Sequence, residues 1–366
     1  MPPGQRLLSI DSLRGLTIAG MILVNDPGNW DAVYSPLEHA EWNGWTPTDL
    51  VFPFFLFLVG VAMVFSFSSR QEKGSTRREL LRHTIRRSLY IYGIGLALHL
   101  YPFTLRRIEH VRVMGVLGRI ALCYFLASLI YLYVSRRVRI AITLSLLLGY
   151  WVVMRYVTVP GFPTGDMTPF GNVAAYFDRL ILGTHLWKPM WDPEGLLSSL
   201  PAIATALLGT FCGEWLRTPR SAKTKVTVLL GAGVLGIVLG ELIHPYFPIN
   251  KNLWTSTFVV FTAGMACLFL SALYWIIDVR GIRGWVMPLE VFGANAILSY
   301  AVATLVIKQM LITSFGGRTV QDLVYWKVFA RLASPKNSSL LFAIAFTMTI
   351  WLIMLVFYRK KIFLRV

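Results

Sequence analysis

Charged residues are scarce in this sequence, at 14% of its 366 residues, whereas a soluble domain carries roughly 25%. Acidic residues are scarcer still, with 18 Asp and Glu against 35 Lys and Arg, and hydrophobic residues make up 55%. This composition argues against a water-soluble enzyme and against a disordered chain. The three cysteines, Cys123, Cys212 and Cys267, all lie in apolar runs. Their placement argues against a disulfide framework and against a metal cluster with ligand spacing.

Long apolar runs are what the sequence has instead. A bilayer core needs about 20 mostly apolar residues per helix, and no long hydrophilic stretch remains between the runs to make a soluble domain. The pattern predicts an all-α, polytopic membrane protein with about ten transmembrane helices, forming a single domain over residues 1–366. The first run is predicted to be a retained helix and not a cleaved signal. The runs are 7–25, 49–69, 86–102, 113–134, 138–158, 196–216, 226–243, 254–276, 287–307 and 339–358.

The basic residues are distributed unevenly between alternate connections. One set of connections, which includes both ends of the chain, carries 21 Lys and Arg, and the other set carries 12. Because cytoplasmic loops are enriched in Lys and Arg, both termini are predicted to be cytoplasmic. Segment 26–48, which has no Lys or Arg, then lies on the opposite side. Topology explains most of the basic excess, so no nucleic-acid partner is expected. Segment 320–333 is a candidate for an extra interfacial helix.

Polar residues gather in the first run, in the connection after it and at the start of the second run. Asp11 and Arg14 are three residues apart, so they can pair on one face of a helix. Asn25 closes the first run. Ionisable residues in or beside the hydrocarbon usually face a partner or a cavity. This segment is therefore the first candidate for a functional site.

Segment 39–49 brings a histidine together with tryptophans and a carboxylate. His39 can take and return a proton or act as a nucleophile, and a carboxylate such as Asp49 can orient its ring. Simpler interpretations stay open: Asp49 can be a helix-start carboxylate after Thr46 and Pro47, and Trp42 and Trp45 can be interface aromatics.

Arg119 stands inside an apolar run, too deep to be a loop charge. It is predicted either to pair with a buried carboxylate, such as Asp49 or Glu290, or to contact an anionic ligand, because a planar guanidinium suits phosphate. Further polar groups mark possible walls of a polar cavity open to the outer face. They are Asp192, Glu194, Asn250, Lys251, Asn252, Glu290 and Asn295.

Several stretches, in order along nearly the whole chain, resemble heparan-α-glucosaminide N-acetyltransferase and its bacterial relatives. They are the run from Ser9 through Gly60, RVMGVLGRIALCY, DPEGLLSSLPA, INKNLWTSTFVVFTAG, PLEVFGANAILSY and the closing YRKKIF. The resemblance implies transfer of an acetyl group from cytosolic acetyl-CoA, across the membrane, to the amino group of a glucosamine-type sugar. It places the family's catalytic histidine on His39, with Asn25 and Asp49 beside it. No metal is implied.

On this basis Asn25 would donate a hydrogen bond to the developing oxyanion, and Asp49 would orient the imidazole. Four arginines are the candidates for binding coenzyme A or lining its route: Arg14, Arg86, Arg119 and Arg280. The acceptor sugar is expected to contact Trp42, Asn43, Trp45, Glu194, Lys251 and Asn252.

The resemblance also implies a multi-pass protein of the bacterial inner membrane, surrounded by lipid, and suggests a homodimer. The lysosomal members carry a lumenal domain and one more helix ahead of this core, and the link between Asn25 and His39 is longer and richer in Pro and Gly here. An amino-sugar transporter without acyl transfer is the alternative. It is weakened by the absence of repeat symmetry in the sequence and by polar residues that gather toward one face.

Overall fold

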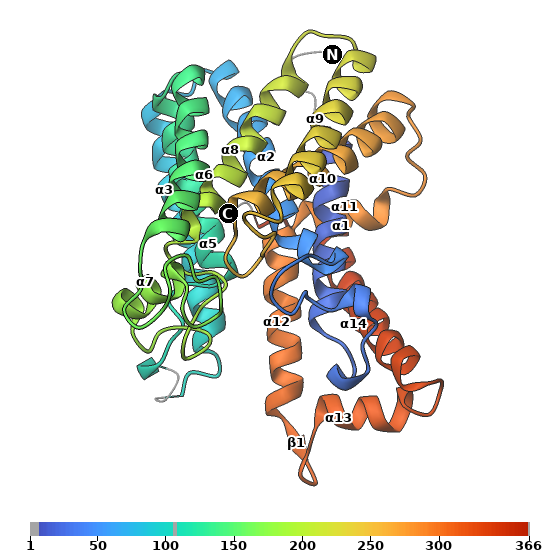
Figure 1. Cartoon of the computed structure of the whole chain (residues 1–366). Coiled ribbons are helices and arrows are strands. Elements are labelled where there is room, and N and C mark those ends of the chain that lie inside the picture. Colours follow the sequence, from blue (N-terminus) through green and yellow to red (C-terminus); the bar gives the residue numbers. More distant parts are fainter. Residues whose placement is uncertain (1–6, 105–107, 365–366) are drawn as a thin grey trace.

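The computed structural model describes residues 7–104 and 108–364, which form a bundle of helices with one small two-stranded hairpin (Figure 1). The hairpin pairs Ser314 with Thr319 and Phe315 with Arg318. The helices are α1 Leu8–Asn25, α2 Val51–Glu72, α3 Arg77–Leu100, α5 Val116–Tyr133, α6 Arg136–Tyr156, α7 Val173–Leu182, α8 Ser199–Arg217, α9 Ala222–Ile243, α10 Ser256–Leu273, α11 Met287–Ala294, α12 Ala296–Ile312, α13 Val320–Val324 and α14 Pro335–Arg359, and the strands are β1 Ser314–Phe315 and β2 Arg318–Thr319.

Several of these helices are long and apolar enough to cross a membrane. Within the described part of the chain there are seven: α1, α2 with its preceding turn, α5, α6, α9, α10 with its continuation to Val279, and α14. The all-α class and the membrane-protein prediction are therefore supported. A count of about ten is not reached, because α3 and α8 are not among the seven. Helix α3 also begins nine residues before its apolar run, in an Arg-rich turn capped by Thr76 and Glu79.

The ninth predicted run is broken in two. Helices α11 and α12 meet at Asn295 with a bend of 84°, so together they make at most one further, discontinuous span. Asn295 has backbone angles outside the helical region, and its side chain is occupied by the end of the chain: its amide donates to the carbonyl of Ile362 and accepts from the N–H of Leu364. The prediction of one continuous helix over 287–307 was wrong, because apolar content alone carries no signal for this break.

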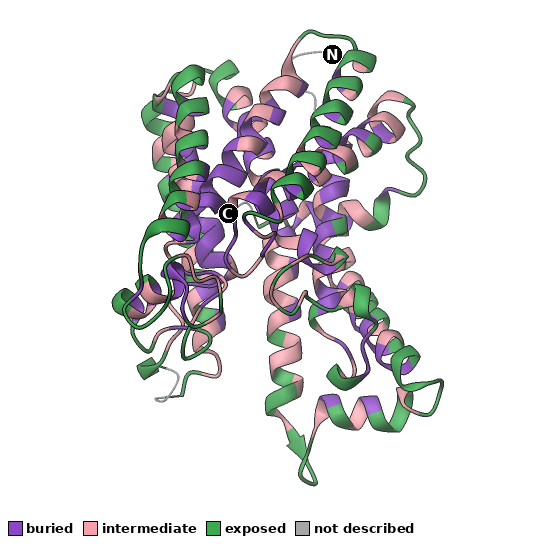
Figure 2. Cartoon of the chain, in the orientation of Figure 1, coloured by how far each residue is buried: buried purple, intermediate pink, exposed green. Residues whose placement is uncertain are grey.

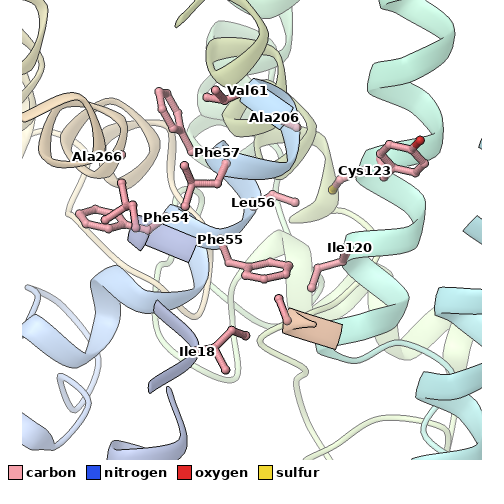
Figure 3. Packing of buried hydrophobic residues seen from close by; sticks show 14 of the residues in the cluster. Ile18, Phe54, Phe55, Leu56, Phe57, Val61, Ile120, Cys123, Ala206 and Ala266 are labelled. Atoms are coloured by element: carbon pink, nitrogen blue, oxygen red, sulfur yellow. The ribbon is translucent and has the colours of Figure 1, made fainter. Parts of the chain in front are cut away.

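Helix α2 lies at the centre of the bundle and packs most closely on α8. A Cβ on Gly60 would lie 1.9 Å from the carbonyl oxygen of Ala206, and one on Gly209 would lie 2.0 Å from that of Phe57. Small residues at such crossings let helix backbones approach each other in membranes. Figure 3 shows the surrounding core, in which Phe57 and Val61 lie near Ala206, and Phe55 lies near Ile120.

Burial separates the inner helices from the outer ones. In Figure 2 buried positions gather where α1, α2, α5, α8 and α10 meet. More than half of each of the spans α1, α2, α5 and α10 is buried, whereas α9 is 17% buried and α6 and α14 are 28% buried. The outer helices keep large apolar side chains exposed, which is the surface expected to face lipid.

Two contacts fix α1, the helix that ends at Asn25. Asp278, at the end of the α10 segment, accepts hydrogen bonds from the N–H groups of Leu8 and Ser9 at 3.1 Å each and so caps the first turn of α1. Farther along, a Cβ on Gly15 would lie 1.9 Å from the carbonyl of Leu289 in α11.

The predicted pair of Asp11 and Arg14 is confirmed at 2.6 Å. Segment 320–333 is helical through Phe329, so a helix is present where an extra one was predicted.

Candidate functional site

A cavity of about 480 Å³ lies between α1, α2, α5 and α12, beneath the connections that join the helices at one end of the bundle. Its volume is in the range of ligand sites, about 300–1,000 Å³. Its deeper walls are mostly apolar, and its polar side chains come mainly from the connections. The lining includes Thr17, Ile18, Met21, Val24, Asn25, His39, Ala40, Glu41, Thr48, Val51, Phe52, Phe55, Arg112, Val116, Leu117, Ile120, Trp187, Lys188, Trp191, Pro193, Glu194, Lys251, Asn252, Ala296, Ile297 and Tyr300.

His39 lines this cavity and is paired with Asp49. Its Nδ1 lies 2.7 Å from Oδ1 of Asp49. The histidine side chain is 46% exposed and the aspartate 1% exposed. The carboxylate therefore sits behind the ring, while the ring remains accessible from the cavity. This is the geometry in which a carboxylate fixes the orientation of an imidazole and stabilises its protonated form.

Asp49 is held by the start of the helix that carries it. Its Oδ2 accepts from the N–H of Thr46 at 3.0 Å and from that of Ala40 at 3.1 Å. Thr46 and Asp49 form a capping box, with Pro47 in the first turn of the short helix Pro47–Leu50 that leads into α2. The predicted helix start is confirmed. The helix-start and ring-orienting interpretations hold together, because the two carboxylate oxygens have different partners.

Lys251 completes a three-residue cluster. Its Nζ lies 2.9 Å from Nδ1 and 3.2 Å from Nε2 of His39, and 3.4 Å from Oδ1 of Asp49. Burial lowers the pKa of this lysine, although the nearby carboxylates of Asp49 and Glu194 act in the opposite direction. The sequence placed Lys251 at the mouth of the site, but gave no indication that it touches the histidine.

Asn25 lines the same cavity from the last residue of α1 and is exposed. The cavity extends along α1 from Asn25 to Thr17, eight residues, which corresponds to about 12 Å of helix. Thr17 donates to the carbonyl of Arg14, one turn farther from the histidine. The cavity thus enters the bundle from the His39 end, and its lining reaches Thr17 and Ala296.

The cavity mouth also contains a cluster of charged residues that the sequence analysis did not predict to meet. Arg112 forms ion pairs with both Asp192 and Glu194, and its Nε donates to Asp192 at 2.8 Å. These carboxylates keep the pKa of Arg112 above its ordinary value despite burial. The sequence does contain a signal for this ion pairing. Arg112 precedes one apolar run, the Asp192-Pro193-Glu194 turn precedes another, and the predicted topology puts both on the same side of the membrane.

Aromatic rings flank this ion cluster. Trp187 and Trp191 line the cavity with their ring centroids 6.1 Å apart, edge to face, and Trp191 packs on Trp42 at 5.3 Å. The indole of Trp42 donates to the carbonyl of Met167 at 2.7 Å, and this hydrogen bond fixes the ring against which Trp191 packs. Lys188 lies over the ring of Trp187 at 4.6 Å. The mouth therefore offers aromatic faces and edges beside charged groups.

Arg119 is fully buried and lies outside the cavity lining. Its Nη2 donates to the carbonyl of Gly195 at 2.9 Å and to the hydroxyl of Ser198, and its guanidinium lies 5.1 Å from the centre of the Trp254 ring. The predicted pairing with Asp49 or Glu290 was wrong. The connection before α8 supplies carbonyl and hydroxyl acceptors in place of a carboxylate.

The other predicted residues fall into three groups. Glu194 and Asn252 line the cavity, whereas Trp42 and Asp49 lie outside the lining and contact Trp191 and His39, which belong to it. Asn43 accepts a hydrogen bond from Asn250 at 3.1 Å, and Trp45 reaches Glu241 at 3.3 Å. The basic residues Arg14, Arg86 and Arg280 lie outside the lining, as do four residues that were predicted as cavity walls: Asp192, Asn250, Glu290 and Asn295.

The fold and this site define a helical membrane protein with an accessible histidine, backed by a buried aspartate, at the mouth of a cavity that enters the bundle. The catalytic family of heparan-alpha-glucosaminide N-acetyltransferase matches residues 6–235, and the chain belongs to that family. It is 29% identical to the human heparan-alpha-glucosaminide N-acetyltransferase over 355 residues, and 29% identical to the mouse protein over 350 residues.

These alignments cover 82% and 81% of this chain, but only 52% and 53% of the human and mouse proteins. The chain thus spans about half the length of the curated relatives that it matches. The family-matched segment ends in α9, so it contains Asn25, His39 and Asp49 but not Lys251. Among the described residues, no three His, Cys, Asp or Glu side chains are grouped as metal ligands.

Proposed function

We propose that this protein is a transmembrane acetyltransferase that moves an acetyl group from cytosolic acetyl-CoA to the amino group of a glucosamine-type sugar or glycan on the exoplasmic side. The observation that carries the proposal is the pairing of His39 with Asp49 at 2.7 Å, at the mouth of a cavity that enters the bundle, in a chain of this acetyltransferase family. The whole chain, residues 1–366, serves as one transmembrane acyltransferase domain.

The distribution of Lys and Arg supports the orientation. In the predicted topology, the connections on the side opposite to His39 carry the basic excess, which supports cytoplasmic termini and an exoplasmic His39. We assign the protein to the bacterial inner membrane as a multi-pass protein. Exposed apolar faces on α6, α9 and α14 offer a surface for lipid or for a second copy of the chain.

The donor enters as a substrate with a strongly anionic nucleotide end. Arg14, Arg86 and Arg280 are the basic residues toward the cytoplasmic end that we assign to it. Arg14 lies one turn beyond Thr17, which lines the cavity. Arg119 acts indirectly, because it holds the connection of Gly195 and Ser198 that forms part of the mouth. The apolar walls suit the pantetheine arm, since they exclude water from the thioester.

The chemistry follows from the orientation of the ring. When Nδ1–H donates to Asp49, Nε2 carries the lone pair and can remove the proton from the attacking amine. The same lone pair can instead take the acetyl group and pass it on, because imidazole is a competent nucleophile. The side-chain amide of Asn25 faces the same cavity and can donate to the oxyanion of the tetrahedral intermediate.

The acceptor sugar occupies the mouth. Sugar rings present apolar C–H faces and polar edges, and the mouth provides both the indoles of Trp187 and Trp191 and the carboxylate of Glu194. Asn252 and Lys251 line the same cavity. An amino group carried by the sugar would thereby approach His39 from the exoplasmic side.

The experiment uses purified protein, acetyl-CoA labelled in the acetyl group, and glucosamine. Wild-type protein should form labelled N-acetylglucosamine, and His39→Ala should lose nearly all turnover while it keeps its thermal stability and its affinity for CoA. Full turnover by His39→Ala would refute the assignment. Acetylated protein trapped without acceptor, and sensitive to hydroxylamine, would identify the route through an acetyl-imidazole.

One observation favours the alternative of an amino-sugar transporter, namely the helix broken at Asn295, since discontinuous helices are typical of transporter binding sites. The two functions differ in their need for CoA. Uptake of labelled glucosamine into proteoliposomes without CoA would support transport. Dependence of product formation on acetyl-CoA would support the acetyltransferase.

A further inference from the structure

The cluster at the cavity mouth contains an amine supplied by the protein itself. Nζ of Lys251 lies 2.9 Å and 3.2 Å from the two ring nitrogens of His39, and its side chain is 17% exposed. Lys251 and Lys188 are the two lysines in the cavity lining of the described chain, and Lys188 instead lies over the ring of Trp187. A group that His39 activates or carries therefore has the Lys251 amine within contact distance.

The turn that carries Lys251 is held by several hydrogen bonds. Asn250 is fully buried and accepts from the N–H of Leu253 at 2.9 Å, while its side-chain amide donates to Asn43 at 3.1 Å. The backbone N–H of Asn250 is bound by the hydroxyl of Thr255 at 3.2 Å. The backbone on both sides of Lys251 is held in this way, and its 17% exposed side chain lies in contact with the histidine.

The surroundings of Lys251 favour a share of neutral amine. Burial is the largest influence and lowers its pKa, and Asp49 and Glu194 oppose it. The other charged groups that line the cavity are Glu41, Arg112 and Lys188, and Arg112 is already paired with Glu194. A neutral lysine amine is the nucleophilic form, and an enzyme that acetylates amines presents a thioester at this position.

We propose that Lys251 is a self-acetylation site, which takes the acetyl group when the donor is bound and no acceptor amine is present. The inference rests on the proposed function. The lone pair of Nζ attacks the thioester carbonyl, a C–N bond forms and the C–S bond breaks. The proton lost by Nζ passes through His39 to the sulfur, and CoA leaves as the thiol, so no oxidant or reductant is needed.

The product is an amide that the site cannot easily reverse. Acetyl-lysine is uncharged, so its contact with Asp49 at 3.4 Å loses the ion-pair component, and the added acetyl group occupies space beside His39. Acetylation therefore inactivates the site, and an acceptor amine protects it by competing for the same acetyl group. The amide resists hydroxylamine, which separates it chemically from an acetyl-imidazole on His39.

The experiment uses the full chain in lipid nanodiscs with carbon-13-labelled acetyl-CoA and no acceptor, followed by peptide mass spectrometry. Label should accumulate on Lys251 in preference to Lys188 by roughly tenfold or more, the ratio that corresponds to about 1.4 kcal/mol in the barrier. It should increase with pH, fall when glucosamine is added, and be absent from Lys251→Arg. His39→Ala should slow the labelling.

The outcomes separate this proposal from the proposed function. Acetylation of glucosamine with no label on Lys251 in acceptor-free samples would overturn the self-acetylation and leave the acetyltransferase intact. Absence of transfer to both would overturn both. A small donor, N-hydroxysuccinimidyl acetate, then tests the lysine alone: faster labelling of Lys251 than of Lys188 supports its reactivity, and equal labelling counts against it.

Discussion

Nδ1 of His39 lies 2.7 Å from Oδ1 of Asp49, and the second oxygen of the same carboxylate is held by the backbone N–H groups of Ala40 and Thr46. The first residue of this pair belongs to an exposed connection and the second to a buried helix start. The capping interaction thus fixes the orientation of a carboxylate that also orients the ring. The position of the imidazole depends on the same hydrogen bonds that begin the span ending at Glu72.

The first prediction concerns this double role. Asp49→Asn should lower turnover by about 10²-fold or more, within the range of about 10²–10⁴ for general acid–base catalysis, because an amide no longer stabilises the protonated ring. The same change should lower thermal stability. The new NH₂ group is a donor, so where it replaces Oδ2 it cannot accept the hydrogen bonds from the N–H groups of Ala40 and Thr46. Turnover and the melting temperature are measured together. Thr46→Ala, which weakens the cap but keeps the carboxylate, is the control, and an equal loss of turnover in it would contradict the orienting role.

The second prediction concerns Asn25. Asn25→Ala should reduce kcat by about 10²–10³-fold if its amide donates to the oxyanion, with little change in KM for the sugar. Asn25→Asp should be worse, because it places an anion where negative charge develops. Asn337→Ala removes an asparagine that bonds Tyr34 outside the cavity, so it should leave kcat unchanged. A change confined to KM would assign Asn25 to substrate binding instead.

The third prediction tests the aromatic mouth. Trp191→Ala should raise KM for the acceptor about tenfold, as expected for a loss of about 1.4 kcal/mol of binding, and should leave KM for acetyl-CoA nearly unchanged. Trp326→Ala is the matched control, because Trp326 is 52% exposed and lies outside the lining. Equal effects of the two variants would show that Trp191 acts as a membrane-interface residue.

The fourth prediction concerns the crossing of α2 and α8. Gly60→Ala should destabilise the protein by about 1–3 kcal/mol or prevent its folding, the usual result of overpacking, because the new methyl group would meet the carbonyl of Ala206. In α6, Gly149→Ala meets nothing within 4 Å and should be tolerated. Detergent-solubilised protein is compared by gel-filtration profile and melting temperature. A normal melting temperature for Gly60→Ala would contradict the close approach.

The fifth prediction is a pH dependence of stability that arises from Asp178 in α7. Burial raises the pKa of this carboxyl from 3.8 to about 6, although it accepts hydrogen bonds from the N–H groups of Leu196 and Leu197. The folded protein therefore binds the proton more tightly than the unfolded chain, so stability falls as pH rises from about 4 to about 6. The loss is at most about 3 kcal/mol, at 1.36 kcal/mol per pKa unit.

Asp178→Asn should remove this component. The variant keeps an acceptor for the two N–H groups, so its melting temperature relative to wild type should rise between pH 4 and pH 7. Melting temperatures are measured at unit pH steps in one detergent and at one ionic strength. Parallel curves for the two proteins would show that Asp178 does not ionise in this window.

Much of the site could be anticipated from local sequence. Thr46, Pro47 and Asp49 are a helix-start pattern, and the structure confirms it. Asp11 and Arg14 pair because three residues bring side chains to one helical face. The resemblance placed His39 beside Asp49, and the structure puts the two in contact. These predictions needed only short-range geometry or a matched motif.

Other features depend on residues far apart in the chain. Arg112 meets Asp192 and Glu194 across some 80 positions, and Lys251 reaches His39 across 212. Either could be proposed from charge, but spacing in sequence does not determine which groups meet. Arg119 is a further example. Its position in an apolar run suggested a carboxylate partner, but it donates to carbonyl and hydroxyl oxygens instead.

The amino-acid sequence by itself determined that the chain is helical and belongs in a membrane, because apolar runs of bilayer length leave few other ways to satisfy the backbone hydrogen bonds. Tertiary structure decided where the bundle is hollow and which amine lies beside the imidazole. It also decided where a span breaks, since the backbone of Asn295 leaves helical geometry where its side-chain amide forms hydrogen bonds with Ile362 and Leu364. Such choices depend on packing between distant segments, and no local pattern of apolar and polar residues records them.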